Sequence, residues 1–208
     1  MTPRHSNAAA AETRESIVRE AVQRASREGL EALTIGTLAA DLDMSKAGVI
    51  GPFGSKEALQ LAALEAGNET FRREVWDPAS ESAPGLERLN AITEAWLAHL
   101  GGGTFPGGCF ITAAAAEFDG RTGPVRDAVD DTLSLWLRAL AREARTAVRQ
   151  GELPADTDPR QVAFELNSIA MGVNQALQLR SDREALRRGR RAMDRVLAPT
   201  PAPAPASR

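Results

Sequence analysis

Three hydroxyl residues and two lysines between positions 34 and 56 have the chemistry to bind phosphate. Thr34, Ser45 and Ser55 each stand directly before an apolar-periodic segment, where a hydroxyl can cap a helix. A capped helix start offers backbone N–H groups and a positive dipole end to an anion. Lys46 and Lys56 directly follow two of these hydroxyls and add positive charge. The spacing therefore predicts contacts with the phosphate backbone of a nucleic acid.

Two short helices joined by a tight turn would hold these side chains. The turn is expected at Asp43-Met44, and the second helix is expected from Lys46 to about Gly51. Such a pair is typical of a helix-turn-helix, whose second helix enters the major groove of DNA. Small side chains at Ala47 and Gly48 would let its backbone come close to the base edges. The inward-facing residues of the first helix are Ile35, Leu38, Ala39 and Leu42.

Pro52 is expected to end the second helix. It lacks an N–H donor, and inside a helix its ring would meet the carbonyl of Gly48. Gly54 then turns the chain, and Ser55 caps a further helix that runs to about Arg73.

The segments LAADLDMSKAGVIGPF and GSKEAL resemble the DNA-binding domain of TetR-family transcriptional repressors. The family pattern is usually A-x-x-x-G-V-S-x-G-x-L-Y-x-Y-F-x-x-K-E-x-L. The resemblance covers roughly residues 13–66 and includes the Phe53-x-x-Lys56-Glu57 step. FPGGCF followed by AAAAEFDGRTGPVRDAV is also similar to the regulatory domain of one TetR subgroup. The resemblance implies a homodimeric, ligand-responsive repressor that binds a palindromic, double-stranded operator.

The chain departs from the family pattern at three consecutive residues. Family members commonly carry an aromatic hydroxyl at the positions of Ile50 and Pro52, and often a histidine at Gly51. Without those donors, several phosphate contacts cannot be transferred, so Lys46 and Lys56 are expected to contribute more. The alternative is an all-α small-molecule- or protein-binding module with weakened DNA affinity, or a helix pair that merely packs. The predicted DNA-binding set is Thr34, Ser45, Lys46, Ala47, Gly48, Gly51, Ser55 and Lys56.

A second set of residues would line a regulatory cavity for an unknown small-molecule effector. Asn167, Met171 and Asn174 lie one or two turns apart near one side of an apolar helix. A few polar groups in an apolar cavity are typical of small-molecule sites. These three residues could equally face a dimer seam or solvent, and core packing explains each aromatic equally well. The predicted ligand-binding set is Trp96, Phe105, Cys109, Phe110, Phe118, Trp136, Asn167, Met171 and Asn174.

The single cysteine and two histidines do not indicate an enzyme or a metal site. Cys109 precedes a helix expected to start at Ile111, so it could be a redox sensor, but buried single cysteines usually act as small hydrophobes. His5 and His99 have no ligand spacing that would bind zinc. No acid, base and nucleophile set converges, and no cofactor is expected.

Composition predicts an all-α protein. Tyrosine is absent and aromatic residues make up 4% of the 208 residues, so alanine and leucine must fill most of the core. The net charge of −3 does not point to a nucleic-acid binder, so DNA would contact a local basic face and helix starts. No leader peptide and no membrane-spanning run is apparent, and a cytoplasmic location is expected.

About nine helices are expected, in two domains. Residues 1–12 and the Pro/Ala-rich residues 199–208 are expected to be disordered, residues 13–56 to form the helix-turn-helix domain, and residues 57–198 the regulatory and dimerisation domain. The last two helices, the eighth and ninth in this count, are implied by the resemblance to form the dimer contact. The helices are expected at about 13–28, 34–42, 46–51, 55–73, 86–100, 111–118, 124–150, 159–177 and 182–197.

Overall fold

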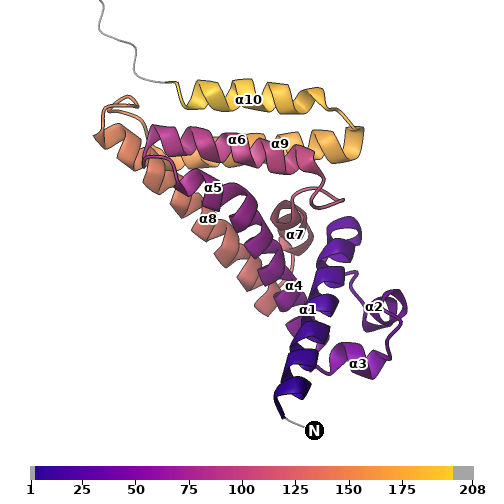
Figure 1. Cartoon of the computed structure of the whole chain (residues 1–208). Helices are drawn as coiled ribbons and strands as arrows, with labels where there is room; N and C mark the ends of the chain where they lie inside the picture. Colours follow the sequence, from indigo (N-terminus) through magenta and orange to yellow (C-terminus); the bar gives the residue numbers. More distant parts are fainter. Residues whose placement is uncertain (1–2, 199–208) are drawn as a thin grey trace, which may run out of the picture. The chain divides into compact units, whose positions relative to one another are not determined.

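Helices account for all the regular secondary structure in residues 3–198, the part of the chain that the computed structural model describes (Figure 1). The expected all-α class is therefore confirmed. The helices are α1 (Pro3–Glu28), α2 (Ile35–Asp41), α3 (Lys46–Ile50), α4 (Lys56–Phe71), α5 (Asp77–Ser80), α6 (Leu86–Gly102), α7 (Phe110–Phe118), α8 (Pro124–Arg149), α9 (Pro159–Arg180) and α10 (Glu184–Val196), with a π-helical segment, Arg72–Trp76, directly after α4.

Side-chain caps begin four of these helices, three of them at the hydroxyl residues where the sequence predicts a cap. The hydroxyls of Thr34, Ser45 and Ser55 and the carboxylate of Asp158 each accept a hydrogen bond from a backbone N–H in the first turn. Each such cap contributes about 1 kcal/mol. The donors are Thr37 at 3.1 Å, Gly48 at 3.0 Å, Ala58 at 3.0 Å and Arg160 at 2.8 Å.

Two segments differ from the sequence-based expectation. Residues 3–12 are helical rather than disordered, because the run Ala8–Ala11 has the highest intrinsic helix propensity and extends α1 backward from Thr13. The short helix α5 lies within the break expected at residues 77–85. The expected disorder of residues 1–2 and 199–208 lies outside the described residues.

The first of two compact units contains the helix-turn-helix. It comprises residues up to Arg72 together with Gly103–Leu133. Helix α1 packs against α2, α4 and α7 around buried apolar residues, and Gly67 of α4 leaves room for the Phe110 ring. The unit is larger than the domain predicted over residues 13–56, whose boundary stays a prediction. Its buried core includes Ile17, Ala21, Leu38, Val49, Leu59, Ala63, Phe110, Phe118, Val125 and Val129.

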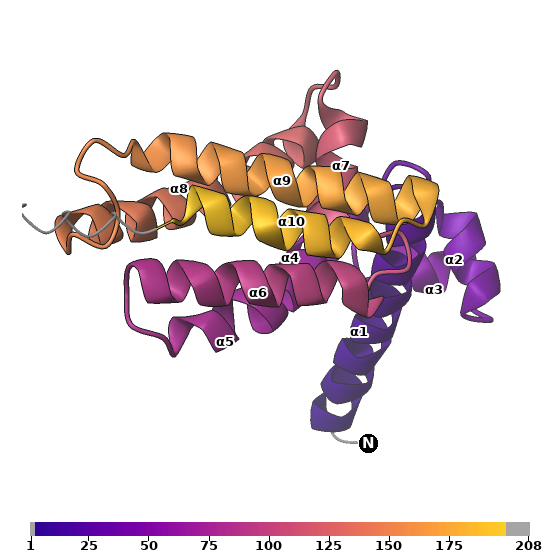
Figure 2. The ribbon, with the colours of Figure 1, turned by 90° about the horizontal axis from the view of Figure 1, so that it is seen from above.

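The second compact unit comprises, within the described residues, Arg73–Gly102 and residues 134–198. Helices α6, α9 and α10 lie side by side in it (Figure 2). Gly189 allows α10 to approach α9, since a Cβ there would lie 2.4 Å from the Val173 side chain. Its buried residues include Leu89, Ile92, Leu140, Leu166 and Met193. Across residues 3–198, no helix is both long and apolar enough to cross a bilayer.

Candidate functional site

Helices α2 and α3 form a helix-turn-helix. Asp43 adopts a left-handed conformation in the turn, with φ 51°, and the Met44 N–H donates to the Ala39 carbonyl at 2.9 Å. Leu38 of α2 and Val49 of α3 are fully buried and hold the pair on the core. The opposite faces of both helices are left available to a partner.

The first turn of α3 presents the predicted DNA-facing residues at the surface. Ser45, Lys46 and Ala47 are exposed, and Gly48 is half-buried. Helix α3 ends at Ile50 as predicted, and exposed Gly51 is its C-cap. The helix start is thus small and accessible, which is what close approach of a backbone to base edges requires.

Lys46 lies beside the first turn of α2. A Cβ built on Gly36 would lie 3.6 Å from Lys46 Cε, 3.9 Å from Lys46 Nζ and 3.9 Å from Thr34 Oγ1. The lysine amine, the Thr34 hydroxyl and the positive end of α2 are therefore neighbours. The positive end of α2 does not stabilise the lysine cation. An anion placed between them would be attracted by the lysine and by the helix N-terminus. This arrangement, called the Lys46–Thr34 site below, fits a phosphate group.

Lys56 is held by the protein itself. Its Nζ donates to the Glu31 carbonyl at 2.7 Å and lies 3.4 Å from the Glu31 carboxylate. Ser55 is exposed and caps α4. The structure therefore brings Lys46 and Thr34 together but ties Lys56 to the turn between α1 and α2.

The carboxylate of Glu31 is stabilised in its charged form. The hydrogen bond from Gln60 is the main cause that lowers its pKa below the ordinary value of 4.5, and the Lys56 and Arg121 charges act in the same direction against partial burial. A lowered pKa in the folded state favours folding above pH 4.5, and this contribution is lost as pH falls through the folded value.

We therefore expect the stability lost in Glu31→Gln to be constant near neutral pH and to shrink as the pH falls below about 4.5. The measurement is urea unfolding of wild type and variant between pH 3 and pH 7. Glu65→Gln, which removes an exposed carboxylate of α4, serves as the matched control for the loss of negative charge. The same pH dependence in both variants would contradict the expectation.

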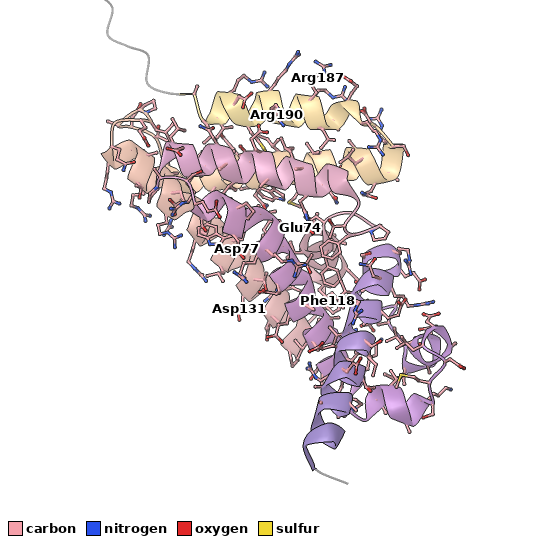
Figure 3. All side chains as sticks on the ribbon, viewed as in Figure 1. Glu74, Asp77, Phe118, Asp131, Arg187 and Arg190 are labelled. Atoms are coloured by element: carbon pink, nitrogen blue, oxygen red, sulfur yellow. The ribbon has the colours of Figure 1, made fainter. Side chains whose placement is uncertain are left out.

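The aromatic members of the predicted ligand-binding set lie in two different compact units. In the first unit, Phe105 and Phe110 are buried with ring centroids 5.7 Å apart, and Phe118 is buried on α7 (Figure 3). In the second unit, Trp96 and Trp136 meet edge-to-face at 5.0 Å. Each ring packs within its own unit, in keeping with the core interpretation of these residues.

The three polar or sulfur-containing residues of α9 have unequal environments. Asn174 is buried, Asn167 is half-buried, and Met171 is 41% exposed. Asn167 Nδ2 lies 3.3 Å from Met171 Sδ. Met171 thus faces the surface of the chain, as the dimer-seam or solvent interpretation expects.

Cys109 is buried and 2% exposed. Burial raises the pKa of its thiol, and hydrogen bonding with Thr112 only partly opposes this shift. A reactive cysteine needs a thiolate and access to solvent. Neither condition favours the redox-sensor interpretation.

Native protein is therefore expected to react with an aromatic disulfide reagent at neutral pH on the order of 100-fold more slowly than urea-unfolded protein. The released aromatic thiolate can be followed by its absorbance, and the signal is unambiguous because the chain has one cysteine. Comparable rates for folded and unfolded protein would show that the thiol is accessible.

Glu117 contacts the helix-turn-helix region but is not among the site residues predicted from the sequence. Glu117 of α7 accepts hydrogen bonds from the backbone N–H groups of Leu30 and Glu31, more than eighty residues earlier. One sequence signal could have indicated Glu117, because it is the only charged residue in the apolar helix FITAAAAEF. The partnership itself carries no local signal, because it depends on how the helices pack.

A shallow groove of about 430 Å³ runs between α9 and α10. Its lining is mainly apolar with one carboxylate and one guanidinium, and none of the predicted ligand-binding residues contributes to it. Elsewhere α10 carries arginines, including Arg187 and Arg190 (Figure 3). Within residues 3–198, no group of three His, Cys, Asp or Glu side chains could hold a metal ion. The groove is lined by Phe164, Glu165, Ser168, Ile169, Ala192, Arg195 and Val196.

Known structures share this arrangement of helices. A TetR transcriptional regulator from Chloroflexus aurantiacus J-10-FL is 21% identical, with a TM-score of 0.82 over 88% of this chain and 93% of that chain. A TetR-family regulator from Cytophaga hutchinsonii is 19% identical, with a TM-score of 0.81 over 91% and 94%. AibR, solved with isovaleryl coenzyme A and operator DNA, is 21% identical, with a TM-score of 0.74 over 90% and 100%. At these identities the similarity shows a common fold.

Sequence similarity adds to this structural likeness. No curated protein sequence matches the chain. The family described as tetracyclin repressor-like, C-terminal domain, matches residues 85–193, which is more than half of the chain. With a helix-turn-helix ahead of that matched region, the chain belongs to the TetR family of transcriptional regulators.

Proposed function

We propose that this chain is a DNA-binding transcriptional repressor that binds a palindromic operator as a homodimer and responds to a small-molecule effector. The observation that carries the proposal is the exposed start of α3 next to the Lys46–Thr34 site. On one surface of the first compact unit, the start of α3 carries small side chains that would allow close approach to base edges. On the same surface, Lys46 and the N-terminus of α2 would bind a phosphate.

Different residues of the helix-turn-helix would contact the base edges and the phosphates of the DNA. Ala47 and Gly48 would let the start of α3 approach the base edges, and Ser45 would contact the backbone or a base edge. Lys46 and Thr34 would bind a phosphate, with Gly51 and Ser55 near the flanking strand. Because Lys56 is bound to Glu31, its contribution to phosphate binding would require that contact to open. AibR, which shares the fold, has been solved with operator DNA.

An uncharged stripe along α9 supports homodimer formation. From Gln161 to Leu179, the exposed residues of α9 carry no charge, although a quarter of the chain is charged, and half-buried Glu165 accepts a hydrogen bond from Gln161. Phe164 is 63% exposed and Leu179 is 77% exposed on this stripe. Exposed apolar surface of this kind is typical of an interface. The stripe consists of Gln161, Phe164, Ser168, Met171, Gly172, Gln175, Gln178 and Leu179.

A two-fold dimer through α9 and α10 would place two helix-turn-helix units on one palindrome. These are the eighth and ninth helices of the sequence-based count. Each unit reads only a half-site, so pairing two of them supplies the affinity and the symmetry that an operator needs. The groove between α9 and α10 borders the same stripe and would receive side chains of the second copy.

The effector would act through the region from Leu86 to the end of α10. The residues of the predicted ligand-binding set remain the candidates for contact with the effector. Binding could shift DNA affinity only by the difference in the effector's affinity for the two states of the dimer. AibR has been solved with isovaleryl coenzyme A, which shows that one protein of this fold binds an acyl-coenzyme A. The proposal includes a cytoplasmic location and no enzymatic activity.

The test is an anisotropy titration with labelled duplexes from the intergenic DNA beside the protein's own gene. We expect Lys46→Ala to weaken binding about tenfold and to reduce the slope of log affinity against log salt by about 1, because one phosphate contact is lost. Arg149→Ala removes an equal charge from the exposed end of α8 in the second unit and should leave binding unchanged.

Amine labelling gives an independent measurement. The chain contains only two lysines, Lys46 and Lys56, so their acetylation in the presence and absence of duplex is read from two peptides. Operator should protect Lys46. Unchanged affinity of Lys46→Ala together with unprotected Lys46 would remove it from the interface. Failure of the wild type to bind any intergenic duplex would favour the second candidate, a binding module whose Ile50-Gly51-Pro52 segment lacks hydroxyl donors.

A further inference from the structure

Side chains from two other helices bind the backbone of Leu30 and Glu31 in the turn between α1 and α2. Glu117 of α7 accepts from Leu30 N at 2.7 Å and from Glu31 N at 3.1 Å. Gln60 and Lys56 of α4 donate to the carbonyls of Leu30 at 2.9 Å and Glu31 at 2.7 Å. All four backbone polar groups of these two residues are thus satisfied from outside the turn.

Gly29 makes space for the carboxylate that binds this turn. It ends α1 with φ +95°, a conformation that favours glycine, and a Cβ there would lie 2.6 Å from Glu117 Oε1. The carboxylate therefore occupies the position that any larger residue would take. Two charge-assisted hydrogen bonds from one carboxylate restrict both the position and the orientation of the turn.

The side chain of Glu31 also contacts α4 and the residues that follow α7. Its carboxylate accepts from Gln60 at 3.0 Å and lies 3.6 Å from the guanidinium of Arg121. Arg121 follows α7 and stacks over Phe118, with its guanidinium carbon 5.2 Å from the ring centroid. Glu117 near the end of α7 and Arg121 just after it thus both contact the turn.

The turn leads directly into the Lys46–Thr34 site. Thr34, the N-cap of α2, is three residues after Glu31, and the Lys46 amine lies beside the same helix start. We propose that Glu117 is a positioning residue for DNA binding: it fixes the turn and thereby the orientation of α2 and α3. This inference rests on the proposed DNA-binding function, because Glu117 would support DNA binding without itself contacting DNA.

The two N–H groups that donate to Glu117 are only partly buried, so water could accept their hydrogen bonds instead. Removal of the Glu117 carboxylate would then leave the helices folded, while the turn would sample more conformations. Ordering it again on DNA would cost affinity, which is the general penalty for lost pre-organisation. A residue that only stabilised the fold would lower the unfolding temperature without that specific loss.

The experiment compares Glu117→Ala, Glu117→Gln and Ala114→Gly in the full-length protein. Glu117→Gln keeps the side-chain length and one acceptor oxygen. Ala114→Gly weakens α7 at a buried position but keeps the Glu117 carboxylate, so it controls for a general loss of stability. The readouts are amide hydrogen exchange of Leu30 and Glu31 by NMR, and DNA affinity by anisotropy with the intergenic duplexes.

Glu117→Ala should exchange the Leu30 and Glu31 amides at least about tenfold faster and bind DNA about tenfold more weakly. Glu117→Gln should recover part of both effects, and Ala114→Gly should behave as wild type at these two amides and in affinity. Wild-type DNA affinity in Glu117→Ala, with or without faster exchange, would overturn the role of Glu117 alone. A wild-type protein that binds no duplex would overturn the proposed function itself, which separates the two failures.

Discussion

Phe164→Asp is expected to leave the protein monomeric at micromolar concentration and to weaken operator binding at least about a hundredfold, because a dimer bound to two half-sites gains this much or more by avidity. The aspartate would replace an apolar ring by a charge within the α9 stripe, and this charge would be desolvated on association. The Phe164 side chain is 63% exposed in the single chain, so its loss should not disturb folding.

Light scattering coupled to size exclusion gives the mass, and anisotropy gives the affinity. Asn90→Asp is the matched control, because it introduces the same charge at an exposed position of α6 in the same compact unit. It should remain dimeric and bind DNA normally. A dimeric Phe164→Asp protein would exclude the α9 stripe as the centre of the interface.

Gly107→Ala is expected to destabilise the first compact unit by at least about 3 kcal/mol, at the upper end of the usual cost of overpacking. A Cβ on Gly107 would lie 1.4 Å from the carbonyl oxygen of Ser26, a buried residue of α1. A helix backbone cannot yield by that distance, so the loop must move and carry Phe105 out of the core.

Urea unfolding at neutral pH measures this loss. Gly120→Ala provides the control within the same unit, because a Cβ there would meet no atom within 4 Å. It should be close to wild type in stability. Equal stability of the two variants would mean that the loop and α1 do not approach each other as closely as the structure shows.

These two substitutions separate assembly from folding. Phe164→Asp should change the association state of a folded chain, whereas Gly107→Ala should change the stability of a unit whose surface residues are untouched. Loss of DNA binding in Phe164→Asp with normal unfolding behaviour would therefore point to the dimer. Any loss of DNA binding in Gly107→Ala would instead be proportional to the loss of folded protein.

The position of Lys56 also changes how the departures from the family pattern are understood. The sequence suggested that Lys46 and Lys56 together replace the missing hydroxyl donors at Ile50 and Pro52. In the structure Lys56 binds Glu31 and Lys46 lies beside the N-terminus of α2. The contribution of Lys46 is therefore expected to exceed that of Lys56, and both remain proposals for the interface.

The sequence by itself determined where most helices begin and end. Thr34, Ser45 and Ser55 cap their helices by accepting hydrogen bonds from the N–H groups three residues later, and Pro52 cannot continue α3. These interactions are local, so the residue types and their spacing suffice to predict them. The exceptions are the start of α1, where the propensity of the alanine run prevailed over the expected fraying, and the short helix α5 within an expected break.

Only the tertiary structure decided which of the chemically capable residues are available. Glu117 reaches Leu30 across 87 positions of the chain, Lys56 is bound by Glu31, and the predicted aromatic lining is divided between two units. Such contacts depend on which helix faces meet, and many sequences with the same periodicity could pair those faces differently. The residue types therefore indicated a phosphate-binding helix-turn-helix, while helix packing determined that Lys46 lies beside Thr34 and that α7 holds the turn before it.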